Sequence, residues 1–178
     1  MIIWLNGAFG AGKTTTAELV ASRSPRLRAF DPESVGFMLR DNLRDHPVAD
    51  FRDWESWRIL TPVVADEVAR FSGQSLVAPQ TVFEEDYWDE LLRGLSERGH
   101  EAFHVLLEAE ESIMRSRIEA DQELAAARQG RLRHLPRYAE ARPWIARRAD
   151  LIVDTTHLAP EEVADLVWAA VRDRVTGH

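Results

Sequence analysis

Residues 7–14 read GAFGAGKT, directly after the apolar run 2–6 and directly before a helical pattern. The eight residues match the P-loop pattern in full, in the strand-to-helix context that the pattern needs. Glycines let backbone N–H groups turn inward around anionic oxygens, and the N-terminus of the following helix adds positive potential at the same point. Lys13 would add a full charge near the β and γ phosphates of a nucleotide. We therefore expect ATP or a close relative to bind here.

The residues expected to hold the phosphates belong to this turn and to the helical turn after it: Gly7, Gly10, Ala11, Gly12, Lys13, Thr14 and Thr15. The hydroxyl of Thr14 is the expected Mg²⁺ ligand. Lys13 is also expected to act in catalysis, and it is the only lysine in a chain whose other strongly basic residues are all arginine. This position alone keeps a compact ammonium, which suits a site that meets phosphate charge.

The composition excludes several classes of protein. A formal net charge of −8 disfavours a nucleic-acid partner, because such affinity depends on clustered cations. Without cysteine there is neither a disulfide nor a thiolate metal site, which suits a reducing cytoplasm. No basic leader precedes the first apolar run, and no later run approaches the ~20 apolar residues that span a bilayer. We expect a cytoplasmic protein without an integral membrane segment, and peripheral membrane association and the oligomeric state stay open.

Short apolar runs alternate with longer helical patterns along the chain, which is typical of βαβ units around a parallel sheet. The expected strands are Ile2 to Asn6, Leu27 to Asp31, Ser75 to Ala78, Glu101 to Leu107 and Leu151 to Asp154. With 178 residues the chain fits about one globular domain, and we expect it to span 1–178. The predicted fold class is a three-layer α/β/α P-loop fold with a mostly five-stranded parallel sheet.

Asp31 closes the second apolar run, where the carboxyl end of a strand beside the P-loop strand faces the ligand crevice. It is a candidate general base, and it is equally a candidate cap for the helix that begins at Pro32. Arg40 and Arg58 follow on helices that would flank the crevice, where guanidinium groups suit phosphate or carboxylate on an acceptor. Glu84 and Glu85 compete with Asp31 to complete the metal shell.

Trp54, Trp57, Tyr87 and Trp88 are candidates for the walls of an acceptor pocket, although core packing explains them as well. The arginine-rich segment 122–146 is interrupted by a glycine and a proline, and we predict a mobile lid there. Such a lid brings a cation onto the transferring phosphoryl group. Four arginines are candidates, of which two are assigned to catalysis: Arg131 and Arg133. A charged, solvated face would have the same sequence, so both interpretations stay open.

Several segments together resemble a known family. They are Ile2 to Gly10, Phe30 to Glu33, Gly36-Phe37, Leu39-Arg40, Trp57-Arg58 and Val77 to Pro79. These segments look like the tunicamycin-resistance ATP-binding protein family, and the similarity covers roughly the first half of the chain. The resemblance implies a role for Asp31, Arg40, Trp57 and Arg58 in binding the acceptor.

More distantly, the chain resembles gluconate, shikimate and chloramphenicol kinases of the nucleoside-monophosphate-kinase superfamily. This resemblance implies the strand order 2-3-1-4-5, a base or acceptor ligand at Asp31, and a lid at residues 131–136. It also implies that Asp154 and Thr155 lie in the loop on the adenine side. Gln80 follows Pro79 where nucleoside-monophosphate kinases have an arginine that grips the acceptor phosphate, which argues against a nucleotide acceptor while keeping Gln80 as a substrate-binding candidate.

The function expected from the sequence is ATP- and Mg²⁺-dependent phosphoryl transfer to a small hydroxylated acceptor. By resemblance, tunicamycin or a similar nucleoside-sugar is the candidate acceptor, and antibiotic resistance is the expected consequence. Two alternatives stay open: an ATP-binding protein that sequesters tunicamycin without chemistry, and a kinase for a small metabolite of the gluconate or shikimate type. The membrane association attributed to members of the resistance family is not expected here, because the C-terminal extension on which it rests is not found.

Overall fold

A computed structural model describes residues 1–122 and 125–177. Five parallel strands form one sheet in the order β2-β3-β1-β4-β5, with the P-loop strand at its centre. Their bounds are β1 Ile2–Asn6, β2 Leu27–Ala29, β3 Ser75–Pro79, β4 Ala102–Glu108 and β5 Leu151–Asp154. The expected fold class and strand order are confirmed. Strand β1 is buried along its whole length. This burial on both faces explains why its sequence is a nearly continuous apolar run.

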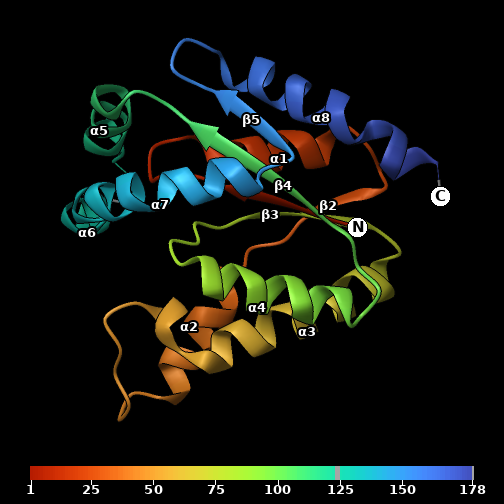
Figure 1. Ribbon diagram of the computed structural model, residues 1–178, viewed down its shortest axis with the longest axis horizontal. Helices are drawn as coiled ribbons and strands as arrows, with labels where there is room; N and C mark the ends of the chain where they lie inside the picture. The colour runs from red at the N-terminus through yellow and green to blue at the C-terminus, as the bar shows by residue number, and fades with distance from the viewer. Residues whose placement is uncertain (123–124, 178) are drawn as a thin grey trace.

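Helices cover both faces of the sheet (Figure 1). Their bounds are α1 Lys13–Ser22, α2 Glu33–Asn42, α3 Glu55–Ser72, α4 Glu85–Ser96, α5 Glu111–Ala120, α6 Arg128–Arg133, α7 Leu135–Arg148 and α8 Pro160–Thr176, with 3₁₀ turns at Phe51–Asp53 and Ala125–Ala127. Successive strand residues point to opposite faces. Ile3 and Leu5 of β1 therefore pack in one core with α1 and α8, and Ile2 and Trp4 pack in the other with α3, α4 and α7.

The second strand is shorter than predicted, because it ends at Ala29 and not at Asp31. Phe30 still donates its N–H to Val77 O, at 2.9 Å, before the chain turns into α2. Asp31 makes that turn, since its Oδ1 accepts the N–H of Glu33 at 2.9 Å. Asp31 therefore lies in a turn at the carboxyl edge of the sheet. Among the described residues, no helix is both long and apolar enough to cross a membrane.

Candidate functional site

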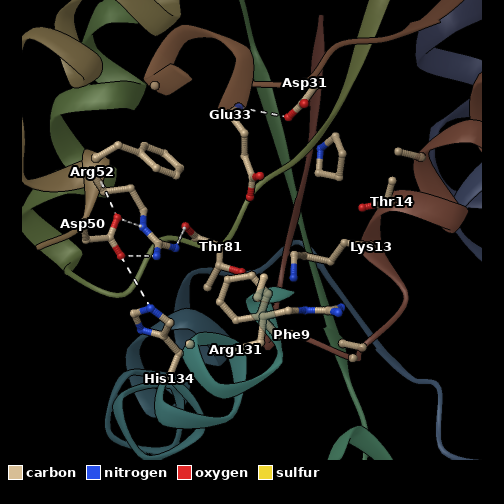
Figure 2. Close-up of a pocket in the computed structure, with 18 of the residues that line it drawn as sticks. Phe9, Lys13, Thr14, Asp31, Glu33, Asp50, Arg52, Thr81, Arg131 and His134 are labelled. Atoms are coloured by element: carbon tan, nitrogen blue, oxygen red, sulfur yellow. Dashed lines mark hydrogen bonds and ion pairs between the residues drawn. The ribbon is translucent and has the colours of Figure 1, made fainter. Parts of the chain in front are cut away.

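A cleft of about 1680 Å³ opens at the carboxyl ends of the strands. The P-loop, the start of α1, α2 and the following segment 43–54, α6 and the β5–α8 loop line it (Figure 2). In an open parallel sheet this edge is where ligands bind. Most of the residues that the sequence assigns to ligands line this cleft: Gly10, Ala11, Gly12, Lys13, Thr14, Thr15, Asp31, Arg40, Arg131, Arg133 and Thr155.

The P-loop backbone is constrained at both ends. Gly12, just before α1, has φ +89°, in the left-handed region that glycine adopts without strain. A Cβ at Gly7 would lie 2.1 Å from the carbonyl oxygen of Leu107, so no larger residue fits beside β4. The side chain of Asn6 accepts the N–H of Gly7 at 2.8 Å, and Thr81 Oγ1 donates to Gly7 O at 2.7 Å. Gly7 thus allows the loop to pack closely against β4, and it does not line the cleft itself.

Lys13 lies at the centre of the cleft (Figure 2). Its Nζ donates to Ala8 O at 2.8 Å and lies 5.3 Å from the centre of the Phe9 ring. Burial lowers the pKa of Lys13 to about 7, Glu33 opposes this shift, and the cations of Arg52 and Arg131 add to it. The charge of the ammonium is therefore unfavourable in the ligand-free protein, and a nearby anion would stabilise it.

On the α8 side of the cleft, Arg117 of α5 ties the P-loop to the β5–α8 loop. Its Nη1 donates to Gly10 O at 3.3 Å and to Thr155 Oγ1 at 3.1 Å, while Nη2 donates to Thr155 O at 2.7 Å. Thr155 lines the cleft. Asp154 does not line the cleft. Its Oδ1 accepts the N–H of Thr156 at 2.9 Å, and hydrogen bonding by Thr156 lowers the pKa of Asp154. No sequence signal marks Arg117.

The carboxylate that points from α2 into the cleft is Glu33 (Figure 2). Burial raises its pKa, and the neighbouring Asp31 charge raises it further, whereas Lys13 and Arg52 lower it. Asp31 also lines the cleft, but it is exposed and its oxygens accept from the Glu33 N–H at 2.9 Å and from Ser34 Oγ at 3.5 Å. Asp31 thus has the capping contacts that the sequence left as one alternative.

A buried ion pair that the sequence does not reveal forms the floor on the α2 side (Figure 2). Arg52 Nε donates to Asp50 Oδ1 at 2.7 Å, its Nη2 pairs with Asp50 Oδ2, and its Nη1 donates to Thr81 O at 2.9 Å. Burial alone would raise the pKa of Asp50, but hydrogen bonds and charge from Arg52 hold it below its usual value. His134 Nε2 lies 3.9 Å from Asp50 Oδ2, and its ring stacks on Phe83.

Three predicted acceptor residues lie behind the Asp50–Arg52 pair and do not line the cleft. Trp57 is fully buried, with its indole N–H donating to Pro32 O at 3.0 Å. Arg58 pairs with Glu90 at 2.6 Å and donates to the carbonyl of Arg52 at 2.8 Å. Gln80 is buried, with Nε2 donating to Thr81 O at 3.0 Å. These three residues form the layer behind the residues that line the cleft. Their contacts are packing and positioning contacts, and none of the three faces the space where a ligand would bind.

Of the four aromatic residues proposed for the acceptor walls, only Trp54 lines the cleft. Trp88 is buried, like Trp57, and packs edge-on against Trp4 with 5.4 Å between ring centres. The Arg58 guanidinium lies 4.0 Å from the centre of the Tyr87 ring, in the layer behind the wall.

The two assigned lid arginines lie at the rim of the cleft on α6. Arg131 Nη1 pairs with Asp121 at 2.7 Å, and its guanidinium lies 5.8 Å from the centre of the Phe9 ring. Arg133 Nε donates to Gln129 O at 3.2 Å. Residues 123 and 124 of the predicted lid lie outside the described residues. Helix α6 thus brings Arg131 close enough to Lys13 for its charge to lower the pKa of that lysine.

The residues present fit a metal ion that is held chiefly by its substrate. Within 1–122 and 125–177, no cluster of three His, Asp or Glu side chains forms a metal cage. Glu84 pairs with Arg137, Glu85 pairs with Arg147 and Arg148, and neither glutamate lines the cleft. The hydroxyl of Thr14 lines the cleft at the first turn of α1. Mg²⁺ bound through nucleotide phosphates and water needs only one or two such protein ligands.

A family model described as an AAA domain matches residues 2–129 of the chain. The chain belongs to this AAA domain family. The match includes the P-loop, α2, the Asp50–Arg52 pair and Arg117, but it ends inside α6. No curated protein is similar enough in sequence to count as a match.

Solved structures share the fold of this AAA domain protein over nearly its whole length. The tunicamycin resistance protein of Deinococcus radiodurans is 27% identical, with a TM-score of 0.70 over 96% of this chain and 94% of that one. The APS kinase CysC of Mycobacterium tuberculosis, in complex with AMPPNP and APS, is 19% identical, with a TM-score of 0.64 over 96% of each chain. The shikimate kinase of Aquifex aeolicus is 20% identical, with a TM-score of 0.60 over 100% of each.

The resemblance to the P-loop kinase-like superfamily is therefore confirmed at the level of fold. The chain has a kinase-like P-loop fold, which implies that it binds a nucleotide.

Proposed function

We propose that the protein is an ATP- and Mg²⁺-dependent phosphotransferase for a small hydroxylated acceptor. The observation that carries the proposal is that Lys13, at the P-loop, and Glu33, on α2, line the same cleft (Figure 2). A cation for the transferring group and a pocket-facing carboxylate for the hydroxyl are the two charges that phosphoryl transfer needs from a protein. Thr14 would help to hold a bound Mg²⁺, which would neutralise part of the phosphate charge.

The side chains divide the work as follows. The backbone N–H groups of the P-loop and Lys13 orient the γ-phosphate and offset its charge. Glu33 accepts the proton of the acceptor hydroxyl as the oxygen bonds to the γ-phosphorus and the bond to ADP breaks. The raised pKa of Glu33 suits this role, because a carboxylate with a higher pKa accepts a proton more readily. Arg131, or its neighbour Arg133, closes over the transferring group from the lid.

We further propose tunicamycin, or a similar nucleoside-sugar, as the acceptor. Support comes from the similarity at 27% identity to a protein named for tunicamycin resistance. The cleft also fits such a ligand physically, since Trp54, Phe37 and Arg40 offer rings and a guanidinium to a planar base. In this case the protein acts in the cytoplasm as a resistance enzyme, without nucleic-acid partners.

The test compares Glu33→Gln with Asp31→Asn as matched variants two residues apart. Glu33→Gln keeps the shape and removes the base, so kcat should fall by roughly 10²-fold at unchanged melting temperature. Asp31→Asn keeps the ability to cap, so kcat should stay within about fivefold of wild type and the free energy of unfolding within ~1 kcal/mol. Turnover is measured as ADP release with tunicamycin and Mg-ATP. The opposite ranking of the two kcat values would return the base to Asp31.

Sequestration without chemistry remains the second candidate, favoured by the ion pairs that occupy the lid arginine Arg131 and the wall arginine Arg52. Mass spectrometry separates the two functions. A transferase adds one phosphoryl mass to tunicamycin and a sequestering protein leaves the mass unchanged. Resistance in a sensitive bacterium that survives Lys13→Ala would also favour sequestration.

A further inference from the structure

The P-loop carries one large side chain, and that side chain lies in the cleft. Residues 7–12 are glycine or alanine except for Phe9, whose ring lines the cleft (Figure 2). Close packing fixes the backbone on both sides of it, because a Cβ at Gly10 would lie 2.5 Å from the carbonyl oxygen of Met114, and Gly7 is held against β4 in the same way. The P-loop pattern leaves position 9 open to any residue. The ring is therefore an addition of this chain to the pattern.

Two cations that the proposed mechanism uses lie beside the Phe9 ring. Lys13 Nζ is 5.3 Å from the ring centre, and the Arg131 guanidinium is 5.8 Å from it. Cation–π attraction acts within ~6 Å of a ring centre, and it is stronger where water is excluded. The two cations also lie close enough together for Arg131 to lower the pKa of Lys13. One ring thus attracts two groups that repel each other.

The Phe9 ring is held in place by a second ring. His134, directly after α6, lies with its ring centre 5.6 Å from that of Phe9 (Figure 2). The same imidazole stacks on Phe83, with 5.4 Å between centres and 19° between the planes. Phe83 is buried in the core. A row of three rings therefore runs from the P-loop to the core, and it gives Phe9 a fixed place beside the two cations.

The partners of Lys13 carry no net charge. Its Nζ donates to Ala8 O at 2.8 Å and lies beside the Phe9 ring, and within 1–122 and 125–177 no carboxylate forms an ion pair with it. A carboxylate in contact with the ammonium would repel an incoming phosphate, because both are anions. A carbonyl and a ring orient the ammonium without this repulsion. The two partners come from consecutive residues of the loop that is expected to bind the phosphates.

We propose that Phe9 is a positioning residue for the γ-phosphate, whose ring holds Lys13 and Arg131 together in the cleft before a nucleotide binds. The inference rests on the proposed function in one respect, that these two cations meet the phosphates. Side chains that are already ordered lose less freedom when a ligand binds, so affinity rises. The P-loop lysine reaches both the β- and the γ-phosphate. Because Arg131 is assigned to the transferring group alone, the ring should matter more for a triphosphate than for a diphosphate.

The experiment measures the dissociation constants of Mg-AMPPNP and Mg-ADP by calorimetry, without an acceptor. Phe9→Leu removes the π face and keeps an apolar side chain, so AMPPNP binding should weaken by roughly tenfold and ADP binding by at most about threefold. Phe9→Tyr keeps the π face and should stay within about twofold of wild type for both nucleotides. Phe71→Leu is the matched control, since Phe71 is 98% exposed on α3, outside the cleft.

A double-variant cycle with Arg131→Gln tests whether the ring acts through Arg131. In the Arg131→Gln background, Phe9→Leu should weaken AMPPNP binding no more than it weakens ADP binding, because the partner that favours the triphosphate is already gone. A tenfold loss of AMPPNP binding that is the same in both backgrounds overturns the proposal.

Selective loss of AMPPNP binding in Phe9→Leu, with Phe9→Tyr and Phe71→Leu like wild type, supports the proposal. Equal loss of both nucleotides overturns it, because Phe9 would then only shape the loop. Tighter binding in Phe9→Leu also overturns it, because the ring would then compete with phosphate for the cations. Absence of nucleotide binding in the wild type has the same consequence. Failure of the phosphotransferase proposal is a separate result, since the selective loss would persist while no acceptor gains a phosphoryl mass.

Discussion

The two ends of the cleft are built in different ways. The end proposed for the phosphates is one continuous stretch, residues 7–15, which forms the P-loop and the start of α1. The acceptor end is assembled from separate segments: Glu33 and Phe37 of α2, Asp50 and Arg52 before α3, Thr81 after β3 and His134 beyond α6. The first depends on the conformation of consecutive residues, and the second on how distant segments pack.

This difference indicates which substitutions should affect ligand binding and which should affect the stability of the fold. Lys13 is a cation whose lowered pKa shows that its charge is unfavourable in the folded, ligand-free protein. Asp50 is an anion whose lowered pKa shows that the fold gains from it, because Arg52 is its partner. A variant of Lys13 should therefore lose ligand and keep the fold, and a variant of Asp50 should lose stability first.

The largest expected effect is that of Asp50→Ala. Removing this carboxylate leaves Arg52 buried at 3% exposure without its partner, which costs about 3 kcal/mol or more of unfolding free energy. For a chain of this size the melting temperature should fall by roughly 6 °C or more. Thermal unfolding of the ligand-free protein measures it. Asp45→Ala is the control. The Asp45 side chain is 79% exposed, so this variant should have the melting temperature of the wild type. An unchanged melting temperature in Asp50→Ala would remove the contrast between the two ends.

A smaller shift is expected from the ligand at the phosphate end. Mg-ATP at about 100 times its dissociation constant should stabilise the wild type by roughly 2.7 kcal/mol, a rise in melting temperature of roughly 5 to 11 °C. Lys13→Ala should lose most of this rise, while its ligand-free form melts at or above the wild-type temperature because a buried cation has been removed. Differential scanning calorimetry with and without Mg-ATP gives both numbers. An equal rise in the two proteins would argue against the phosphate site.

The smallest expected effect is the uptake of a fraction of a proton at Lys13 when a nucleotide binds. It tests the assignment of Lys13 to the phosphate site. Because Lys13 is the only lysine, a ¹³Cε label gives one lysine resonance to titrate. Its midpoint should lie near 7 in the free protein and move upward with a bound non-hydrolysable nucleotide, since phosphate charge favours the ammonium. The sign follows: below about pH 6 binding takes up no proton at Lys13, and as the pH rises through 7 uptake increases. A free-protein midpoint near the ordinary value of about 10.4 would contradict this.

Sequence reasoning could place the phosphate end residue by residue, but only part of the acceptor end. Asp31 and Glu33 are carboxylates two residues apart that both line the cleft, and nothing in the sequence decides which one is held by capping contacts. The turn into α2 decides it, because Asp31 is occupied by the N–H of Glu33 itself. Trp57 and Arg58 show a related limit, since a pattern that places them on a helix beside the crevice does not tell the lining layer from the layer behind it.

The sequence by itself determined the phosphate loop, the α/β class and four of the five strands to within a residue at either end, because glycine positions and apolar runs act through local backbone conformation. Only the tertiary structure decided the acceptor end. The carbonyl of Thr81 and the ring of Phe83, which are about thirty residues away in the sequence, contact Arg52. Asp50 and Arg52 are residue types that usually lie on the surface, but these contacts bury them as a pair that forms the floor of the cleft. Distances between segments far apart in sequence are set by packing, and no local pattern carries them.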